Sequence, residues 1–198
     1  MSKFYSFLFA SCLLLMACSH NARPIGKPLP QLSFEHLKPY AIQGGAVRIQ
    51  QSFVEHPQSK ALSAKFPIAP DKLLQRYAAK RFVTRQTAQQ GAQERLVFDI
   101  KDASVSKIND PEGLISFFAG TAVDYYTLNM LVAMTPIRRD GQRAAPFTVK
   151  FNRRLSLPHN LSLAEREFRQ FEFLEKAISD IDQSITQIVQ HKMTTQYF

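Results

Sequence analysis

The chain has 198 residues, of which 45% are hydrophobic, and 25 lysines and arginines against 16 acidic residues give a formal net charge of +9. This length allows one domain with a sizeable core plus a linker, whereas two domains would be crowded. The positive charge predicts a basic surface, which could bind an anionic partner or serve only solubility.

An apolar run from Phe4 to Met16 follows a single cation, Lys3, at the amino terminus. The run is about a dozen residues long, whereas a helix needs roughly 20 residues to cross a bilayer. It therefore favours a signal peptide over a transmembrane helix. The run closes with Leu15-Met16-Ala17-Cys18, in which a small residue precedes a cysteine.

This Leu15-Met16-Ala17-Cys18 motif resembles the lipobox of bacterial lipoprotein signal peptides. In that family the cysteine thiol is diacylated, the chain is cut before the cysteine, and the new amino terminus is acylated. The resemblance implies that Cys18 is the lipidation site and that residues 1–17 are removed; a free structural cysteine is the alternative. Cys12 follows Ser11 and could also be the lipidation site, but cutting there would leave too short an apolar run. Cys12 would therefore be removed with residues 1–17, and the mature chain, with Cys18 as its one cysteine, would contain no disulfide.

The expected location follows from the residue after Cys18. In enterobacterial sorting an aspartate at that position resembles an inner-membrane retention signal, and this chain has Ser19. The outer membrane is therefore predicted, with the protein lipid-anchored on its periplasmic face, and bacteria with other sorting rules leave the inner membrane open. Removing residues 1–17 takes away one cation, Lys3, and leaves a net charge of about +8. An exported protein rarely meets nucleic acid, so lipid head groups, lipopolysaccharide phosphates and acidic envelope proteins are the expected counter-charges.

Residues 18–45 are predicted to be a tether after the lipidated cysteine. Its prolines and terminal glycines are Pro24, Pro28, Pro30, Pro39 and Gly44-Gly45. Proline-rich segments are extended, at roughly 3.1 Å per residue, so this one could hold a domain several nanometres from its anchor. A short apolar patch, Leu32, Phe34 and Leu37, could instead dock onto the domain.

The folded domain is predicted to span residues 46–198. Apolar and polar residues alternate over 46–54, which predicts a strand, and a polar loop follows as far as Lys65. Pro70 stands where the first turn of a helix tolerates proline, and apolar residues then recur at helical spacing, which predicts a helix over 70–86.

Three further strands are expected in the second half of the domain. Alternation marks one strand from Arg95 to Val105. A longer strand from Val123 to Ile137 has one apolar face and a second face that is half apolar, which suggests a central strand. Asp140-Gly141 then predicts a tight hairpin turn, because glycine accepts the positive φ that a type I′ turn demands. The return strand covers residues 145–151.

The last predicted element is a helix of about eight turns that begins at Ser162. Ser162 and Glu165, three residues apart, have the spacing of a capping box. Apolar residues then step by threes and fours along one face: Ala164, Phe168, Phe171, Leu174, Ile178, Ile181, Ile185 and Ile188. This face could cover the open side of the sheet, or the helix could protrude as a coiled-coil arm.

Together the elements predict an α+β fold, a two-layer sandwich in which an antiparallel meander in the order β-α-β-β-β-α carries a long C-terminal helix. The succession of lipobox, proline-rich tether, strand, Pro67-to-Phe82 segment, Phe98-Asp99-Ile100-Lys101-Asp102-Ala103 strand end, hairpin and final helix resembles the auxiliary lipoprotein components of ABC-type transport systems. The resemblance covers most of the mature chain. It implies an outer-membrane protein that docks onto transport or assembly machinery, and it assigns no individual residue a role.

The search for catalytic chemistry points away from an enzyme. The five histidines are scattered, and no metal-binding, serine-nucleophile or phosphate-binding motif is present. Four carboxylates fall near strand ends and could converge, although turn and surface roles are expected for them: Asp99, Asp102, Asp110 and Asp124. We therefore expect no cofactor, no metal and no catalysis.

Two stretches could carry binding. Gly113 to Gly120 places Leu114, Ile115, Phe117 and Phe118 in a connection between strands, where they either fold back on the core or contact a lipid or a partner. Six cations within seventeen residues form the second, an anion-facing patch: Arg138, Arg139, Arg143, Lys150, Arg153 and Arg154. Ordinary solubility of the hairpin also explains the cations at the turn.

The resulting expectation is a non-catalytic lipoprotein that is held at the membrane through Cys18 and serves an envelope protein complex as an accessory. The alternative is a structural lipoprotein that binds cell wall or lipopolysaccharide directly.

Overall fold

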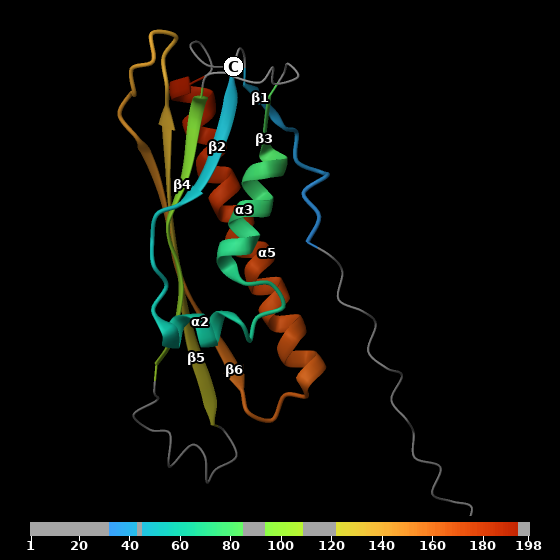
Figure 1. Cartoon of the computed structure of the whole chain (residues 1–198). Helices are drawn as coiled ribbons and strands as arrows, with labels where there is room; N and C mark the ends of the chain where they lie inside the picture. The colour runs from blue at the N-terminus through green and yellow to red at the C-terminus, as the bar shows by residue number, and fades with distance from the viewer. Residues whose placement is uncertain (1–31, 43–44, 85–93, 109–121, 194–198) are drawn as a thin grey trace, which may run out of the picture. The chain divides into compact units, whose positions relative to one another are not determined.

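A four-stranded sheet in the order β2-β4-β5-β6 carries the fold, with its long helices on one side (Figure 1). The computed structural model describes residues 32–42, 45–84, 94–108 and 122–193, all within one compact unit that begins at Gln31. The elements are β1 (Tyr40–Ile42), β2 (Ala46–Gln51), α2 (Pro57–Ser63), α3 (Pro70–Arg81), β3 (Phe82–Thr84), β4 (Glu94–Ile108), β5 (Val123–Pro136), β6 (Phe147–Pro158), α5 (Leu163–Ile188) and a π-helical turn η2 (Val189–Met193).

The α+β class is confirmed, but the sheet is mixed and not a purely antiparallel meander. β5 pairs antiparallel with both β4 and β6, as the predicted hairpin requires, and like β4 it is an interior strand of the sheet, as its pattern suggested. β2, however, runs parallel to β4. Between them the chain passes through α2 and α3, and such a crossover returns the next strand in the same direction as the first.

Helix α3 begins at Pro70, as predicted, and buries Leu73, Leu74, Tyr77 and Ala78. It ends at Arg81, short of the predicted residue 86. From Phe82 the backbone is extended, and β3 pairs in parallel with β1. The early end of α3 therefore depends on the pairing of β3 with a strand some forty residues earlier in the chain. Helical periodicity in the sequence gives no information about such pairing.

Residues 32–42, predicted to belong to the tether, contact the domain. Phe34 is buried and its ring meets that of Tyr77 edge-on at 5.7 Å, while Leu32 and Leu37 pack against the same core. The sequence left open whether this apolar patch docks, and it does. The described fold therefore extends to the amino-terminal side of Ala46.

Helix α2 replaces part of the predicted polar loop. β4 is longer than β2, and α2 lies against the part of β4 that β2 leaves unpaired. There the Ser59 hydroxyl accepts a hydrogen bond from the Val105 backbone N–H at 3.0 Å and donates one to Glu55 at 2.8 Å. Covering an exposed strand edge in this way satisfies backbone groups that would otherwise face water.

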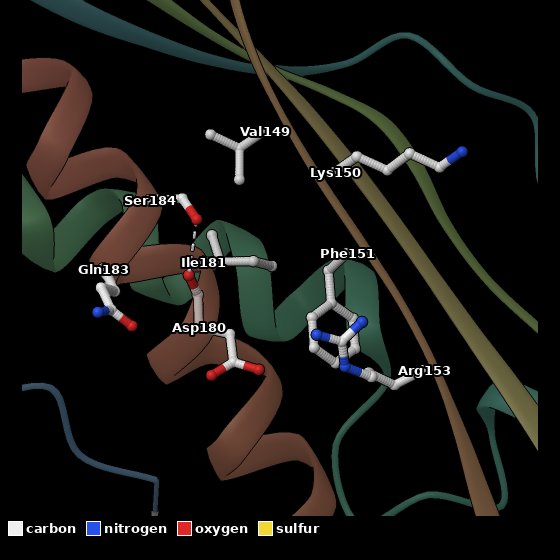
Figure 2. Close-up of a pocket in the computed structure, with 8 residues that line it drawn as sticks. All are labelled: Val149, Lys150, Phe151, Arg153, Asp180, Ile181, Gln183 and Ser184. Carbon is white, nitrogen blue, oxygen red and sulfur yellow. Dashed lines mark hydrogen bonds between the residues drawn. The ribbon is translucent and has the colours of Figure 1, made fainter.

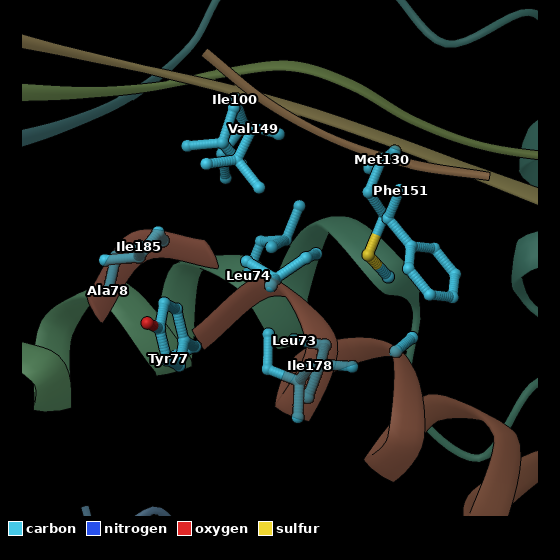
Figure 3. Packing of buried hydrophobic residues seen from close by; sticks show 14 of the residues in the cluster. Leu73, Leu74, Tyr77, Ala78, Ile100, Met130, Val149, Phe151, Ile178 and Ile185 are labelled. Atoms are coloured by element: carbon cyan, nitrogen blue, oxygen red, sulfur yellow. The ribbon is translucent and has the colours of Figure 1, made fainter. Parts of the chain in front are cut away.

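The core lies between the sheet and the pair α3 and α5 (Figure 3). Along α5 the residues Phe171, Leu174, Ile178, Ile181 and Ile185 are buried, so this helix covers the sheet and does not protrude as an arm. Only its first turns depart from this pattern, where Leu163 and Phe168 are 73% and 47% exposed.

The predicted capping box and the predicted hairpin turn can both be checked in the structure. Ser162 accepts a hydrogen bond from the Glu165 N–H, and the Glu165 carboxylate accepts one from the Ser162 N–H, which completes the capping box. At the hairpin Gly141 has the predicted positive φ, 82°, in the left-handed region that favours glycine. The predicted type I′ turn is wrong, however, because that turn needs a positive φ at both central residues and no described residue other than glycine has one. The Gly141 N–H donates to the Arg138 carbonyl at 3.0 Å, so the central residues of the turn are Arg139 and Asp140. Within the described part of the chain, no helix combines the length and the apolar character needed to cross a membrane.

Candidate functional site

The candidate site is a groove between strand β6 and helix α5 (Figure 2), which we call the β6–α5 groove. Its volume is about 280 Å³. The residues that line it are Val149, Lys150, Phe151, Arg153, Asp180, Ile181, Gln183 and Ser184.

The floor of the groove is apolar. Alternation along β6 points Val149 and Phe151 toward α5, where both are buried beside Ile181. The Phe151 ring also contacts that of Phe173, with ring centroids 6.4 Å apart. The floor is therefore continuous with the core.

The walls of the groove are polar. Asp180, Gln183 and Ser184 come from α5, and the Ser184 hydroxyl donates to the Asp180 carbonyl at 3.0 Å. On the strand side the Arg153 guanidinium lies 5.6 Å from the centroid of the Phe151 ring and donates to the Asn152 carbonyl at 3.0 Å. Stacking of this kind keeps the charged group in water while its stem covers apolar surface.

The outer edge of β6 borders the groove. Among the described residues β6 pairs with β5 alone, so it is an edge strand twelve residues long. In an antiparallel pair alternate residues direct their N–H and C=O groups away from the partner strand. Along this edge a row of backbone donors and acceptors therefore stands outside the ladder.

The face of β6 that points away from α5 is basic. Lys150 and Arg154 lie on it with Asn152 between them, and all three are exposed. The Asn152 amide hydrogen-bonds the amide of Asn129 on β5, and the Arg154 guanidinium lies 5.8 Å from the Tyr125 ring centroid. Within the described chain neither Lys150 nor Arg154 forms an ion pair.

The six cations of the predicted patch occupy three places. Arg138, Arg139 and Arg143 are exposed around the hairpin turn, Lys150 and Arg154 lie on the outer face of β6, and Arg153 faces the groove. A strand rises roughly 3.3 Å per residue, so Arg143 and Arg154 stand on the order of 36 Å apart. Closeness in sequence does not gather these side chains into one site, because a strand keeps them extended.

The three predicted carboxylates that the structure describes do not converge either. Asp99 is buried and accepts from Gln50 at 3.0 Å and from Lys101 at 2.7 Å. Burial by itself would raise the pKa of Asp99, but the hydrogen bonds from Lys101 and Gln50 outweigh it and lower that pKa. Asp102 accepts from the Ser104 N–H at 3.0 Å. The fourth carboxylate of the prediction, Asp110, lies outside the described residues.

Asp124 is the centre of a separate cluster of basic side chains. Its carboxylate lies 2.7 Å from Lys107 Nζ, 2.9 Å from His159 Nε2 and 3.2 Å from Arg166 Nη1. Burial opposes ionisation of Asp124, yet the hydrogen bonds from these three groups outweigh it and hold the pKa of Asp124 well below its ordinary range. A carboxylate held permanently ionised joins elements and is a poor proton donor.

A wider hollow of about 640 Å³ lies between α2 and the end of β4, where His56, Leu62, Lys65 and Ser106 are among its lining residues. It lies where α2 covers β4, and there the Ser59 hydroxyl already accepts a hydrogen bond from the Val105 backbone N–H. Nowhere in the described residues do three or more His, Cys, Asp or Glu side chains gather in a way that could hold a metal ion.

Two predicted sites fall outside the described residues. They are the lipidation site, Cys18, and the apolar loop residues Leu114, Ile115, Phe117 and Phe118. Both stay predictions.

Sequence reasoning found the strand side of the groove but missed the helix side. Asp180, Gln183 and Ser184 lie beside the buried Ile181 on α5, and the helical pattern marks them only as flanking positions. Their position opposite β6 is decided by the fold, because about thirty residues of sequence separate the two walls of the groove.

Solved structures include one that this chain resembles at low sequence identity. No protein-family model matches the chain, and no curated protein matches it. Among solved structures the chain is similar to the rare lipoprotein B from Shewanella oneidensis, with 13% sequence identity and a TM-score of 0.38. The match covers 77% of this chain and 98% of that one. At this level of similarity it gives no residue of the chain a role.

Proposed function

We propose that this chain is a lipid-anchored protein of the bacterial envelope that docks onto a transport or assembly complex and catalyses no reaction. The observation that carries the proposal is the open edge of β6 beside an apolar groove and a basic face. Small-molecule sites are usually closed around most of their ligand, whereas a long unpaired strand offers a surface suited to another polypeptide.

The proposed location comes from the amino terminus. The resemblance of Leu15-Met16-Ala17-Cys18 to a lipobox supports an anchor at Cys18, and Ser19 supports the outer membrane, with the domain facing the periplasm. The resemblance to the auxiliary lipoprotein components of ABC-type transport systems agrees with an accessory role. A net charge of +9 suits a partner with acidic surface.

The arrangement of titratable groups supports a role without catalysis. General acid–base chemistry needs a group within hydrogen-bond reach of a bound substrate. The carboxylates of Asp99 and Asp124 are instead paired with Lys101 and Lys107, and neither lines the β6–α5 groove. Among the residues that line the groove, Asp180 alone carries a carboxylate.

The test is site-specific cross-linking in living cells. A photoreactive amino acid replaces Asn152, which is exposed on the edge strand, and a matched variant carries it at Arg76, which is exposed on α3. We expect the Asn152 variant to give one defined cross-linked envelope protein, identified by mass spectrometry, and the Arg76 variant to give none.

Other results would count against the proposal. Cross-linking to glycan or lipopolysaccharide alone would support the alternative, a structural lipoprotein that binds cell wall or lipopolysaccharide directly. Equal cross-linking from both positions would show that β6 is not a docking site.

A further inference from the structure

The geometry points to one class of partner for the β6 edge: an extended protein segment that adds to the sheet beside β6, with apolar side chains toward α5 alternating with acidic side chains on the opposite face. This inference rests on the proposed function and specifies how docking occurs. It follows from three features of β6, which are its unpaired backbone, its groove and its charge.

The first feature is the backbone. β6 runs for twelve residues, and in the described chain only its β5 side is paired. A partner strand would use the free N–H and C=O groups of alternate residues, so the backbone supplies affinity whatever the partner's sequence. Side-chain pockets on the two faces then supply specificity.

The second feature is the groove. An added strand lies roughly 4.8 Å from β6, and its alternate side chains point to the same face as Val149 and Phe151. On that face they meet the β6–α5 groove, whose floor of Val149, Phe151 and Ile181 is apolar. The partner positions that meet this floor should therefore be apolar. The polar rim consists of Arg153, Asp180, Gln183 and Ser184.

The third feature is the charge on the other face. Lys150 and Arg154 stand four positions apart, and their cross-strand neighbours on β5 are the uncharged Leu131 and Thr127. Cross-strand pairs of opposite charge stabilise a sheet, whereas like charges directly opposite destabilise it. Acidic residues at the alternate positions of the partner would pair with these cations.

The same charges argue against a second copy of this chain as the occupant. If two β6 strands paired antiparallel about Asn152, Lys150 of each copy would face Arg154 of the other. Residues 19–31 and 194–198 of the chain are no better suited, because they contain no acidic residue. Charge complementarity thus favours a separate acidic partner.

The experiment uses the purified lipidated protein in detergent and a synthetic peptide of alternating valine and glutamate, with both ends blocked. Hydrogen–deuterium exchange measured by mass spectrometry should show protection of residues 147–158 when the peptide is bound. Binding followed by fluorescence anisotropy should weaken by about tenfold or more when the ionic strength rises well above the physiological value.

Charge-reversed variants give the matched comparison. Lys150→Glu with Arg154→Glu should reduce affinity by about tenfold or more, because two cross-strand charge pairs become repulsive. Arg138→Glu with Arg139→Glu changes the net charge equally but lies at the hairpin turn, so affinity should stay within about twofold. A valine–lysine peptide should bind the first variant and not the native protein. All four side chains are exposed, so melting temperatures should barely move.

Several outcomes would overturn the inference. Equal loss of affinity in both double variants would mean diffuse attraction, and protection elsewhere than residues 147–158 would mean another site. A dimer in sedimentation that involves β6 would make a second copy the occupant. If the peptide fails to bind while Asn152 still cross-links a defined envelope protein in cells, strand addition is wrong and the docking function stands. If both fail, the proposed function falls as well.

Discussion

Arg81 is the charged side chain that joins the docked amino-terminal segment to both long helices. It is 5% exposed, and its Nε lies 2.7 Å from Asp182 Oδ1 on α5. It also donates to the Lys38 carbonyl, the Tyr40 hydroxyl and the Thr186 hydroxyl, and its guanidinium lies 4.1 Å from the centroid of the Tyr40 ring. A single buried cation thus connects three parts of the chain.

Replacing Arg81 by Met should therefore be strongly destabilising. It leaves the Asp182 carboxylate in the interior without its cation, and breaking a buried pair from one side costs about 3 to 5 kcal/mol. Urea unfolding measures the loss. The double variant Arg81→Met with Asp182→Leu should lose less than the sum of the two single variants, and Arg76→Met, exposed on the same helix, should change stability by no more than about 0.5 kcal/mol. A loss at Arg81 no larger than at Arg76 would contradict the buried network.

Asp124 sets a pH dependence for stability. Burial disfavours its charge, but hydrogen bonds from Lys107, His159 and Arg166 outweigh burial and place its pKa below the unfolded value of about 4. Because the folded pKa is the lower one, the stabilisation is fully present above about pH 4 and is lost as the pH falls toward the folded pKa.

Asp124→Asn should accordingly destabilise the protein by about 1.5 to 3 kcal/mol at neutral pH, the contribution typical of hydrogen bonds to a charged group. The difference from the native protein should shrink as the pH is lowered from 7 toward 2. Urea unfolding at several pH values measures this. Glu172→Gln, an exposed carboxylate on α5, is the matched control and should show no comparable trend. A difference that stays constant across the pH range would rule out the ionised Asp124 as its source.

At the scale of the element, helix α5 has leucines both in the core and in solvent. Leu174 is fully buried under the sheet, whereas Leu163 is 73% exposed at the first turn. Leu174→Ala should cost about 2 to 5 kcal/mol, because it removes buried surface and leaves a cavity. Leu163→Ala, the same change on the same helix, should cost no more than about 0.5 kcal/mol. Thermal unfolding distinguishes them, and similar small losses would favour the protruding arm over the sheet cover.

At the scale of the whole molecule, the anchor decides where the domain acts. Cys18→Ser should abolish cleavage by the lipoprotein peptidase and leave a chain without acyl groups, both visible by mass spectrometry. The native protein should sediment with membranes even in high salt, because two or more acyl chains give stable anchoring whereas one chain gives only marginal binding. A native amino terminus other than an acylated Cys18 would end the lipoprotein interpretation.

Local signals in the sequence determined most of the elements. The alternation over residues 123–137, the Asp140-Gly141 pair and the Ser162 and Glu165 spacing each depend on a few neighbouring residues. The strand, the positive φ at Gly141 and the capping box are present in the structure, although the turn is not of type I′. Such signals predict elements well because strand alternation, turn conformation and helix capping each depend on residues that are close together in the sequence. The α+β class follows from the same signals.

Only the tertiary structure decided how the elements meet. The parallel pairing of β2 with β4, the early end of α3 at Arg81 and the docking of Phe34 all require contacts between distant segments. The candidate site is of the same kind, since the charges predicted as one patch are separated by an extended strand and the other wall of the groove comes from α5. Which edge of the sheet stays open depends on strand order, and strand order is set by packing of the whole chain and by no local pattern.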